Sequence, residues 1–209
     1  ALPICTTIAT MRYPPGHKEA TRARITRAGA KLFREKGFTA TGVDAVMAEA
    51  GLTPGGFYAH FESKEDLFGS AVAEALEQVR SWHQNWSEGH KGFARIRAFF
   101  TSYLSPAHCK AVSDGCPLPA LLPEIARSSP GVFEPFNQQV TMWIDDMVES
   151  MSPSQPGDRD LASAWICFAA GALQLARAER SSRQAARILR TSRGQMELLI
   201  RTREQQRER

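Results

Sequence analysis

Apolar residues recur three and four positions apart along most of the chain, which is the spacing of amphipathic helices rather than of strands. In residues 18–36, for example, Ile25, Leu32 and Phe33 belong to one apolar stripe, and Gly37 ends it. The same spacing persists over residues 64–86 and predicts one long helix there. Further helices are predicted, in order along the chain, over residues 93–104, 117–127, 131–151, 159–178 and 181–203. We therefore predict an all-α fold.

Residues 38–68 contain two short apolar segments on either side of a tight turn. Val46 and Met47 lie on the apolar face of the first segment, which Gly51 can end because glycine adopts the left-handed conformation without steric cost. Thr53 is a suitable N-cap for a second helix, and Pro54 fits its first turn. This is the layout of a helix-turn-helix, whose second helix enters the major groove of DNA.

The second helix of this motif has an unusual surface. Gly55 and Gly56 each cost roughly 1 kcal/mol relative to alanine in a helix, which favours a role in close approach to a partner. The two phenylalanines of the segment are predicted to face inwards, and this leaves Tyr58 and His60 as candidate contacts.

Positive charge is concentrated around the motif. Residues 12–36 hold eight lysines and arginines against two glutamates, in a chain whose net charge is only +4. Ser63 is expected to cap the next helix, and Lys64 in its first turn is well placed to meet a phosphate. Such cations supply the part of DNA affinity that does not depend on sequence.

The segment FTATGVDAVMAEAGLTPGGFYAHFESKEDLF at residues 38–68 resembles the DNA-binding motif of the TetR family of transcriptional regulators. That motif has a glycine-ended helix, a three-residue turn, an aromatic pair and a lysine. The resemblance extends over about residues 18–80. It implies an N-terminal domain of three helices and a C-terminal helical bundle for ligand binding and dimerisation.

The resemblance also implies which residues touch DNA. Tyr58, His60 and Lys64 would hold phosphates, residues 53–56 would approach the DNA backbone or base edges, and the start of the first motif helix would meet a phosphate. This chain has Gly42 where the family usually has serine or threonine. The expected DNA-binding residues are Thr41, Gly42, Thr53, Pro54, Gly55, Gly56, Tyr58, His60 and Lys64.

Three parts are expected along the chain. Residues 1–11 read as an upstream extension or a disordered tail, because Met11 resembles a natural start; residues 12–62 form the helix-turn-helix domain and residues 63–209 the helical domain. The resemblance implies that the last two helices pack against the same two helices of a second chain in a homodimer. The expected partners are a palindromic operator in double-stranded DNA and a small hydrophobic effector that releases the protein, acting as a repressor, from that operator.

The helical domain is rich in aromatic and thioether side chains, which suggests an apolar effector pocket, although such residues at helical spacing also build ordinary cores. Cys116 stands at a predicted helix start, where the helix dipole favours a thiolate, and its segment resembles an element of electrophile-responsive family members. The expected ligand-binding residues are Trp82, Trp86, Phe100, Tyr103, Cys116, Leu121, Trp143 and Met147.

Signatures of other functions are missing from the sequence. There is no P-loop, no nucleophile elbow and no zinc-protease motif, and the four cysteines lack metal-ligand spacing. We expect no catalytic residue, metal or cofactor, and a cytoplasmic protein, since no apolar run reaches the roughly 20 residues that span a bilayer. Two alternatives stay open: a redox or electrophile sensor acting through Cys116 on the same scaffold, and a helical ligand-binding protein or enzyme without specific DNA binding.

Overall fold

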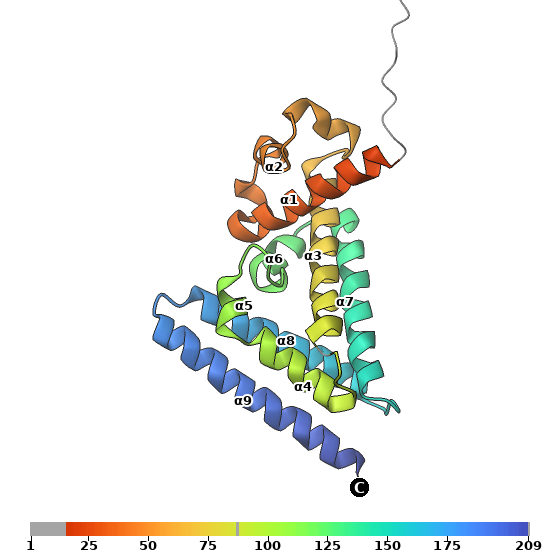
Figure 1. The fold of residues 1–209 in the computed structure, drawn as a ribbon, viewed down its shortest axis with the longest axis vertical. Helices are drawn as coiled ribbons and strands as arrows, with labels where there is room; N and C mark the ends of the chain where they lie inside the picture. The colour runs from red at the N-terminus through yellow and green to blue at the C-terminus, as the bar shows by residue number, and fades with distance from the viewer. Residues whose placement is uncertain (1–15, 87, 209) are drawn as a thin grey trace, which may run out of the picture.

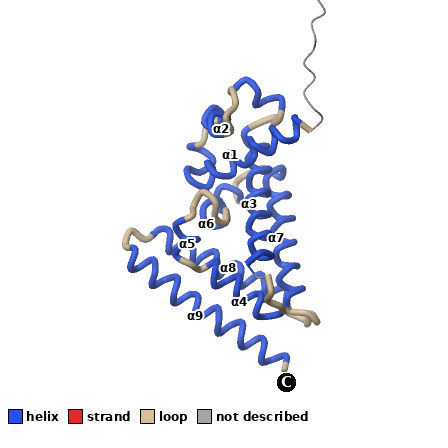
Figure 2. Tube along the Cα trace, in the orientation of Figure 1, coloured by secondary structure: helices blue, strands red, loops and turns tan. Residues whose placement is uncertain are grey.

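The computed structural model describes residues 16–86 and 88–208, so the predicted N-terminal extension lies outside the described residues. Every regular element in the described part is a helix, which confirms the all-α prediction (Figure 2). The helices are α1 (His17–Ala40), α2 (Val43–Glu49), the 3₁₀ helix η1 (Pro54–Ala59), α3 (Lys64–Trp86), α4 (Gly92–Tyr103), α5 (Pro106–Lys110), α6 (Leu118–Ile125), α7 (Pro130–Ser150), α8 (Asp158–Ala178) and α9 (Ser182–Arg207).

Helices α1, α2 and η1 form the helix-turn-helix unit at one end of the molecule (Figure 1). Gly37 interrupts α1 with φ 80° and ψ 168°, so the regular helix breaks where the sequence predicted. The second motif helix begins at Pro54 as predicted, but it is a short 3₁₀ helix, and Thr53 makes no hydrogen bond through its side chain to cap it. The poor helix propensity of the two glycines that follow Pro54 is consistent with this tighter geometry.

Helix α3 connects the helix-turn-helix unit to the rest of the protein. It begins beside α1 and then runs alongside α7, as Figure 1 shows. The two helices approach closely at Gly69, where an added Cβ would lie 2.8 Å from the Gly131 carbonyl oxygen. Ser63 caps α3 as predicted, since its Oγ accepts a hydrogen bond of 3.0 Å from the Asp66 N–H.

The segment between α4 and α6 lies between two predicted helices and was itself predicted to contain none. It contains the short helix α5, and His108, Gly115 and Cys116 are all buried. The segment enters the interior because its polar groups find partners there, and these bonds are described below.

Helices α8 and α9 pack against each other, and α8 also contacts α6 and α7. Against expectation, α8 is long and apolar enough, by length and composition, to span a membrane, and 44% of its apolar stretch is buried inside the protein. Phe168 and Leu175 on α8, with Leu198 and Leu199 on α9, are nevertheless 38% to 64% exposed. These four side chains leave part of the helix pair's apolar surface uncovered.

Candidate DNA-binding interface and effector site

The turn and the start of η1 are presented to solvent. Thr53, Pro54 and Gly55 are exposed, and a Cβ built on Gly55 would meet nothing within 4 Å. Tyr58 is 75% exposed, although its ring packs edge-on against the buried Phe57 at 5.2 Å. The buried ring therefore holds the tyrosine in place while its hydroxyl remains free to reach a partner.

Arg22 of α1, which the sequence analysis did not single out, connects the end of η1 to α1 and α3. Its guanidinium donates to the His60 carbonyl oxygen and, at 3.2 Å, to the Ser70 hydroxyl. It also lies 4.0 Å from the centre of the Phe61 ring, a cation–π contact. One cation thus joins α1, the end of η1 and α3.

The two residues predicted to meet DNA at the start of α2 differ in their exposure to solvent. Gly42 is exposed, but Thr41 is only 1% exposed, and its hydroxyl donates to the Gly37 carbonyl oxygen at 2.7 Å. In this structure the Thr41 side chain closes the end of α1 and does not point to solvent.

Lys64 has a similar internal role. Its ammonium donates to the carbonyl oxygens of Phe38 at 3.0 Å and Thr41 at 3.2 Å, and it lies 4.2 Å from the centre of the Phe38 ring. An ammonium has three N–H groups, so one remains available to an approaching phosphate.

A cleft of about 580 Å³ lies between the start of α1 and residues 53–58, which we call the reading segment. His60 lines it, and its Nδ1 is buried without a hydrogen-bond partner. Burial, followed by the nearby charges of Lys18 and Arg22, lowers the pKa of His60. Lys18, Thr53 and Gly56 line the same cleft, so α1 brings a cation to the side of the motif where the reading segment is exposed.

A second cleft, of about 310 Å³, lies in the helical domain between the end of α3, α4 and α5. Three aromatic side chains form its walls, and hydroxyl and imidazole groups supply polar atoms. Its lining residues are Trp82, Phe99, Ser102, Tyr103, Ser105, Ala107, His108 and Ala111.

This cleft contains only part of the predicted effector set. Trp82 and Tyr103 line it, whereas the side chain of Trp86 lies outside the described residues. The other predicted residues are at most 1% exposed and do not line it, and these are Phe100, Cys116, Leu121, Trp143 and Met147. They pack in the core because α4, α6 and α7 place their apolar faces against one another and against Cys116, which precedes α6.

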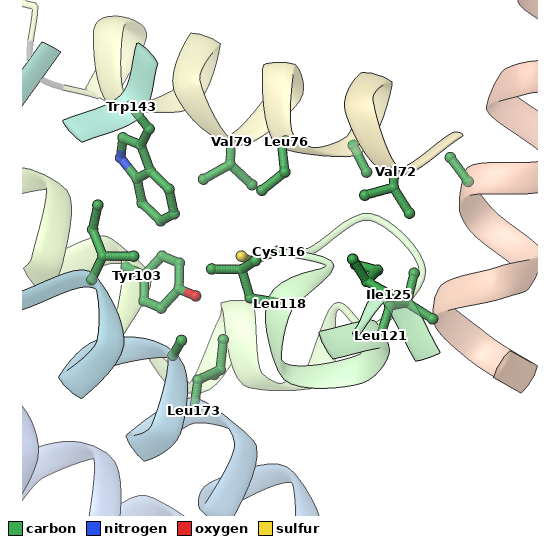
Figure 3. Packing of buried hydrophobic residues seen from close by; sticks show 14 of the residues in the cluster. Val72, Leu76, Val79, Tyr103, Cys116, Leu118, Leu121, Ile125, Trp143 and Leu173 are labelled. Carbon is green, nitrogen blue, oxygen red and sulfur yellow. The ribbon is translucent and has the colours of Figure 1, made fainter. Parts of the chain in front are cut away.

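Cys116 lies in the middle of this core, between Val79 of α3, Leu118 and Leu173 of α8, with the Tyr103 hydroxyl pointing toward it (Figure 3). Burial raises the pKa of the Cys116 thiol above its ordinary value, and the Tyr103 hydroxyl offsets this only in part. The expectation that the helix start favours a Cys116 thiolate is therefore wrong. The residue precedes α6 but is buried away from solvent, and desolvation of the thiolate outweighs the effect of the helix dipole.

His108 is a functional candidate that no sequence motif singles out. The Cys116 N–H donates to His108 Nε2 at 3.0 Å, so this nitrogen must be unprotonated, and the neutral ring then carries its proton on Nδ1, 2.7 Å from the Tyr103 carbonyl oxygen. Burial lowers the pKa of His108 to about 4. The same ring lines the aromatic cleft, so it links that cleft to the backbone at Cys116.

Two arginines, the buried Arg34 and the half-buried Arg177, hold the same segment. Arg177 of α8 donates to the carbonyl oxygens of His108 at 3.1 Å and Cys109 at 3.3 Å, and Arg34 of α1 donates to that of Gly115 at 3.2 Å. Gly115 has no space for a side chain, since an added Cβ would lie 2.4 Å from the Ala111 carbonyl oxygen. The helix-turn-helix unit and α8 are therefore joined through residues 108–116.

Comparison with known proteins gives matches at both the sequence and the structure level. Residues 25–71 match the family described as "Bacterial regulatory proteins, tetR family". The uncharacterized HTH-type transcriptional regulator YerO of Bacillus subtilis is 44% identical over 50 residues, which are 24% of this chain and 17% of YerO. The HTH-type transcriptional regulator LmrA of Bacillus subtilis is 28% identical over 125 residues, covering 59% of this chain and 66% of LmrA.

The fold as a whole has a close structural counterpart. A TetR transcriptional regulator from Chloroflexus aurantiacus matches with a TM-score of 0.70 and 28% identity, over 86% of this chain and 93% of that one. The matches to the first four curated relatives cover only 17% to 41% of those proteins.

Proposed function

Because the chain belongs to the TetR family of bacterial regulatory proteins, we propose that it is a DNA-binding transcriptional repressor and not an enzyme. The main support for this proposal is the reading segment at residues 53–58, which exposes Thr53, Pro54, Gly55 and Tyr58 and is held in place by buried rings and by Arg22. Tyr58 contacts a phosphate, and Gly55 and Gly56 let the backbone approach the DNA closely. A cytoplasmic location accords with this function.

Within this proposal, the contact residues have two roles. Tyr58, Gly42 and residues 53–56 touch DNA directly, and Lys64 offers a phosphate its remaining N–H. Thr41 and His60 act mainly from inside, because the Thr41 hydroxyl bonds to α1 and His60 Nδ1 is buried. The cation Lys18 adds to the non-specific part of the affinity from the start of α1.

A homodimer places two such segments on one DNA duplex. The exposed apolar side chains of α8 and α9, Phe168, Leu175, Leu198 and Leu199, support dimerisation through these two helices. Gly171 and Gly194, where an added Cβ would meet nothing within 4 Å, leave room for a partner helix to approach. Two reading segments related by a two-fold axis require a palindromic operator, with half-sites about one helical turn, roughly 34 to 36 Å, apart.

The effector site is the aromatic cleft lined by Trp82, Phe99 and Tyr103. Its aromatic walls suit a small apolar or aromatic molecule, and Ser105 and His108 provide a hydrogen-bonding end. A ligand in the cleft would displace His108 and so disturb its hydrogen bond with the Cys116 N–H. The change would reach α1 because Arg34 of α1 is hydrogen-bonded to the neighbouring Gly115 carbonyl oxygen. Reaction of the Cys116 thiol with an electrophile is disfavoured by its complete burial.

The test measures binding of the full chain to DNA upstream of its own gene by fluorescence anisotropy, at fixed salt and with excess nonspecific competitor. We expect competitor-resistant binding that Tyr58→Ala weakens about tenfold, or about 1.4 kcal/mol, for all DNA sequences alike. Phe133→Ala is the matched control, because Phe133 is also an exposed aromatic residue, 48% exposed, but lies on α7.

The possible failures of this test have different meanings. If no competitor-resistant complex forms with upstream DNA or with sequences selected from a random duplex pool, the regulator proposal fails. If a complex forms but Tyr58→Ala binds as tightly as Phe133→Ala, only the assignment of the phosphate contact fails.

A further inference from the structure

A third cleft, of about 350 Å³, lies where the helix-turn-helix unit meets the helical domain. It is lined by one face of α1, the end of α2, Gln78 of α3 and Asp114 in the segment after α5. Gln78 lies fourteen residues after the start of α3, which is about 21 Å along a helix. The cleft is thus at the junction of the two domains and separate from the aromatic cleft.

The lining of this cleft is strongly charged. Its cations are Arg24, Arg27, Lys31 and Arg34, and its carboxylates are Glu49 and Asp114. Four cations against two carboxylates leave a formal charge of +2. The four cations all belong to α1, where spacings of three and four residues place them on one face.

Two of these cations are already engaged. Lys31 forms an ion pair of 2.7 Å with Glu49, and Arg24 donates to the Ala50 carbonyl oxygen at 2.7 Å. Arg27 is exposed, and its side chain makes no hydrogen bond or ion pair within the described residues. A long side chain held on this face without a partner is free to turn toward a bound anion.

The burial of Arg34 distinguishes this cleft from an ordinary solvent-exposed basic helix face. It is 5% exposed, its Nε is buried without a hydrogen-bond partner, and its guanidinium forms no ion pair among the described residues. Burial lowers the pKa of Arg34 and outweighs the opposing effect of the Asp114 carboxylate, so the charge of this buried cation is only partly compensated, which is unfavourable. Arg177 nearby is a second guanidinium, whose hydrogen bonds within the described residues go to carbonyl oxygens, and its positive charge further lowers the pKa of Arg34.

We propose that this junction cleft is a binding site for a small anionic metabolite carrying phosphate or carboxylate groups, held by Arg27 and Arg34. The volume is large enough for a small organic anion, and the cations provide charge-assisted hydrogen bonds of the kind that bind such groups tightly. Asp114, an exposed carboxylate in the same lining, repels anions and so limits the total negative charge that the site accepts.

A ligand in this position would touch both domains, since α1 and α2 belong to the helix-turn-helix unit while Gln78 and Asp114 belong to the helical domain. It would therefore restrict their relative movement and alter DNA affinity. This consequence alone depends on the proposed function. Binding of the anion does not, and it is measured without DNA.

The experiment titrates the full-length protein with pyrophosphate and, separately, with citrate by isothermal titration calorimetry, with sodium chloride adjusted to keep ionic strength constant. We expect saturable binding of at least one of these probes at one site per chain. Arg27→Gln should raise its Kd at least tenfold, and this variant tests the site without risk to folding because Arg27 is exposed and unpaired.

Two control variants locate the binding. Arg187→Gln removes an exposed arginine of α9, and Lys18→Gln removes a cation of the cleft beside the reading segment. Both should change Kd less than twofold. The proposal is overturned if neither probe binds saturably, or if Lys18→Gln or Arg187→Gln weakens binding as much as Arg27→Gln does.

Discussion

Acidification from about pH 7 to about pH 5 should destabilise this protein through His108. The ring is 8% exposed, accepts the Cys116 N–H on Nε2 and directs Nδ1 at the Tyr103 carbonyl oxygen. A proton added to Nε2 would meet that N–H, and the charged ring would lie near the Arg177 guanidinium. Only the neutral ring satisfies both contacts.

The magnitude follows from the difference between the folded and unfolded pKa. The folded pKa is about 4, and the unfolded pKa is about 6.5. Between these values the unfolded chain binds more protons than the folded one, so stability from this group is complete above about pH 6.5 and is lost as the pH falls. The loss is about 2 kcal/mol by pH 5 and about 3 kcal/mol by pH 4.

The assay is urea unfolding followed by circular dichroism at about pH 7, 6 and 5, at one protein concentration, because dimerisation would make stability depend on concentration. His108→Gln should be less stable at pH 7, since it loses ring contacts and leaves the Cys116 N–H poorly satisfied. Its stability should nevertheless fall less with acid than that of the unaltered chain, by about 2 kcal/mol at pH 5.

His90→Gln is the control, because His90 is an exposed histidine before α4. It should follow the unaltered chain at every pH. A constant difference between His108→Gln and the unaltered chain from pH 7 to pH 5 would refute the neutral, buried role of His108.

Two further predictions concern the helical domain. Asp158 is 1% exposed and pairs with Arg203 and Arg207, so Asp158→Asn should lower the free energy of unfolding by about 3 to 5 kcal/mol, measured by urea unfolding. The control Asp145→Asn breaks an exposed ion pair and should lower it by less than about 1 kcal/mol. Similar losses in the two variants would contradict the burial argument. Leu175→Glu places a charge on the exposed apolar surface of α8 and should convert dimers to monomers in sedimentation velocity, whereas a dimer of unchanged affinity would exclude this surface as the interface.

Much of the fold was predictable because helical periodicity and helix capping depend on residues that are close to one another in the sequence. The break of α1 at Gly37, the cap at Ser63 and the start of η1 at Pro54 all follow from the conformational preferences of one or two residues. The exposure of Tyr58 was also expected, since the inward phenylalanines on either side leave it no buried position.

The tertiary structure decided what each predicted face meets. An apolar stripe specifies that Trp143 or Met147 is buried, but not whether it lines a cleft or fills the core. A threonine before a helix is equally suited to meet a phosphate or to bond inwards, and here Thr41 bonds to the end of α1. For such residues the sequence predicted the type of environment and not the partner.

Buried and half-buried polar groups show this limit most clearly. Arg34 bonds to a carbonyl 81 positions away, and Arg177 bonds to carbonyls 68 and 69 positions away. Local pattern gives no account of such bonds, because they exist only once distant segments have been brought together. The sequence by itself determined the long helices and the helix-turn-helix unit, because these follow from local periodicity and capping. Only packing in three dimensions decided which charges are buried, which cleft is aromatic, and how residues 108–116 join the two domains, since burial and hydrogen bonding depend on neighbours that the folded chain supplies.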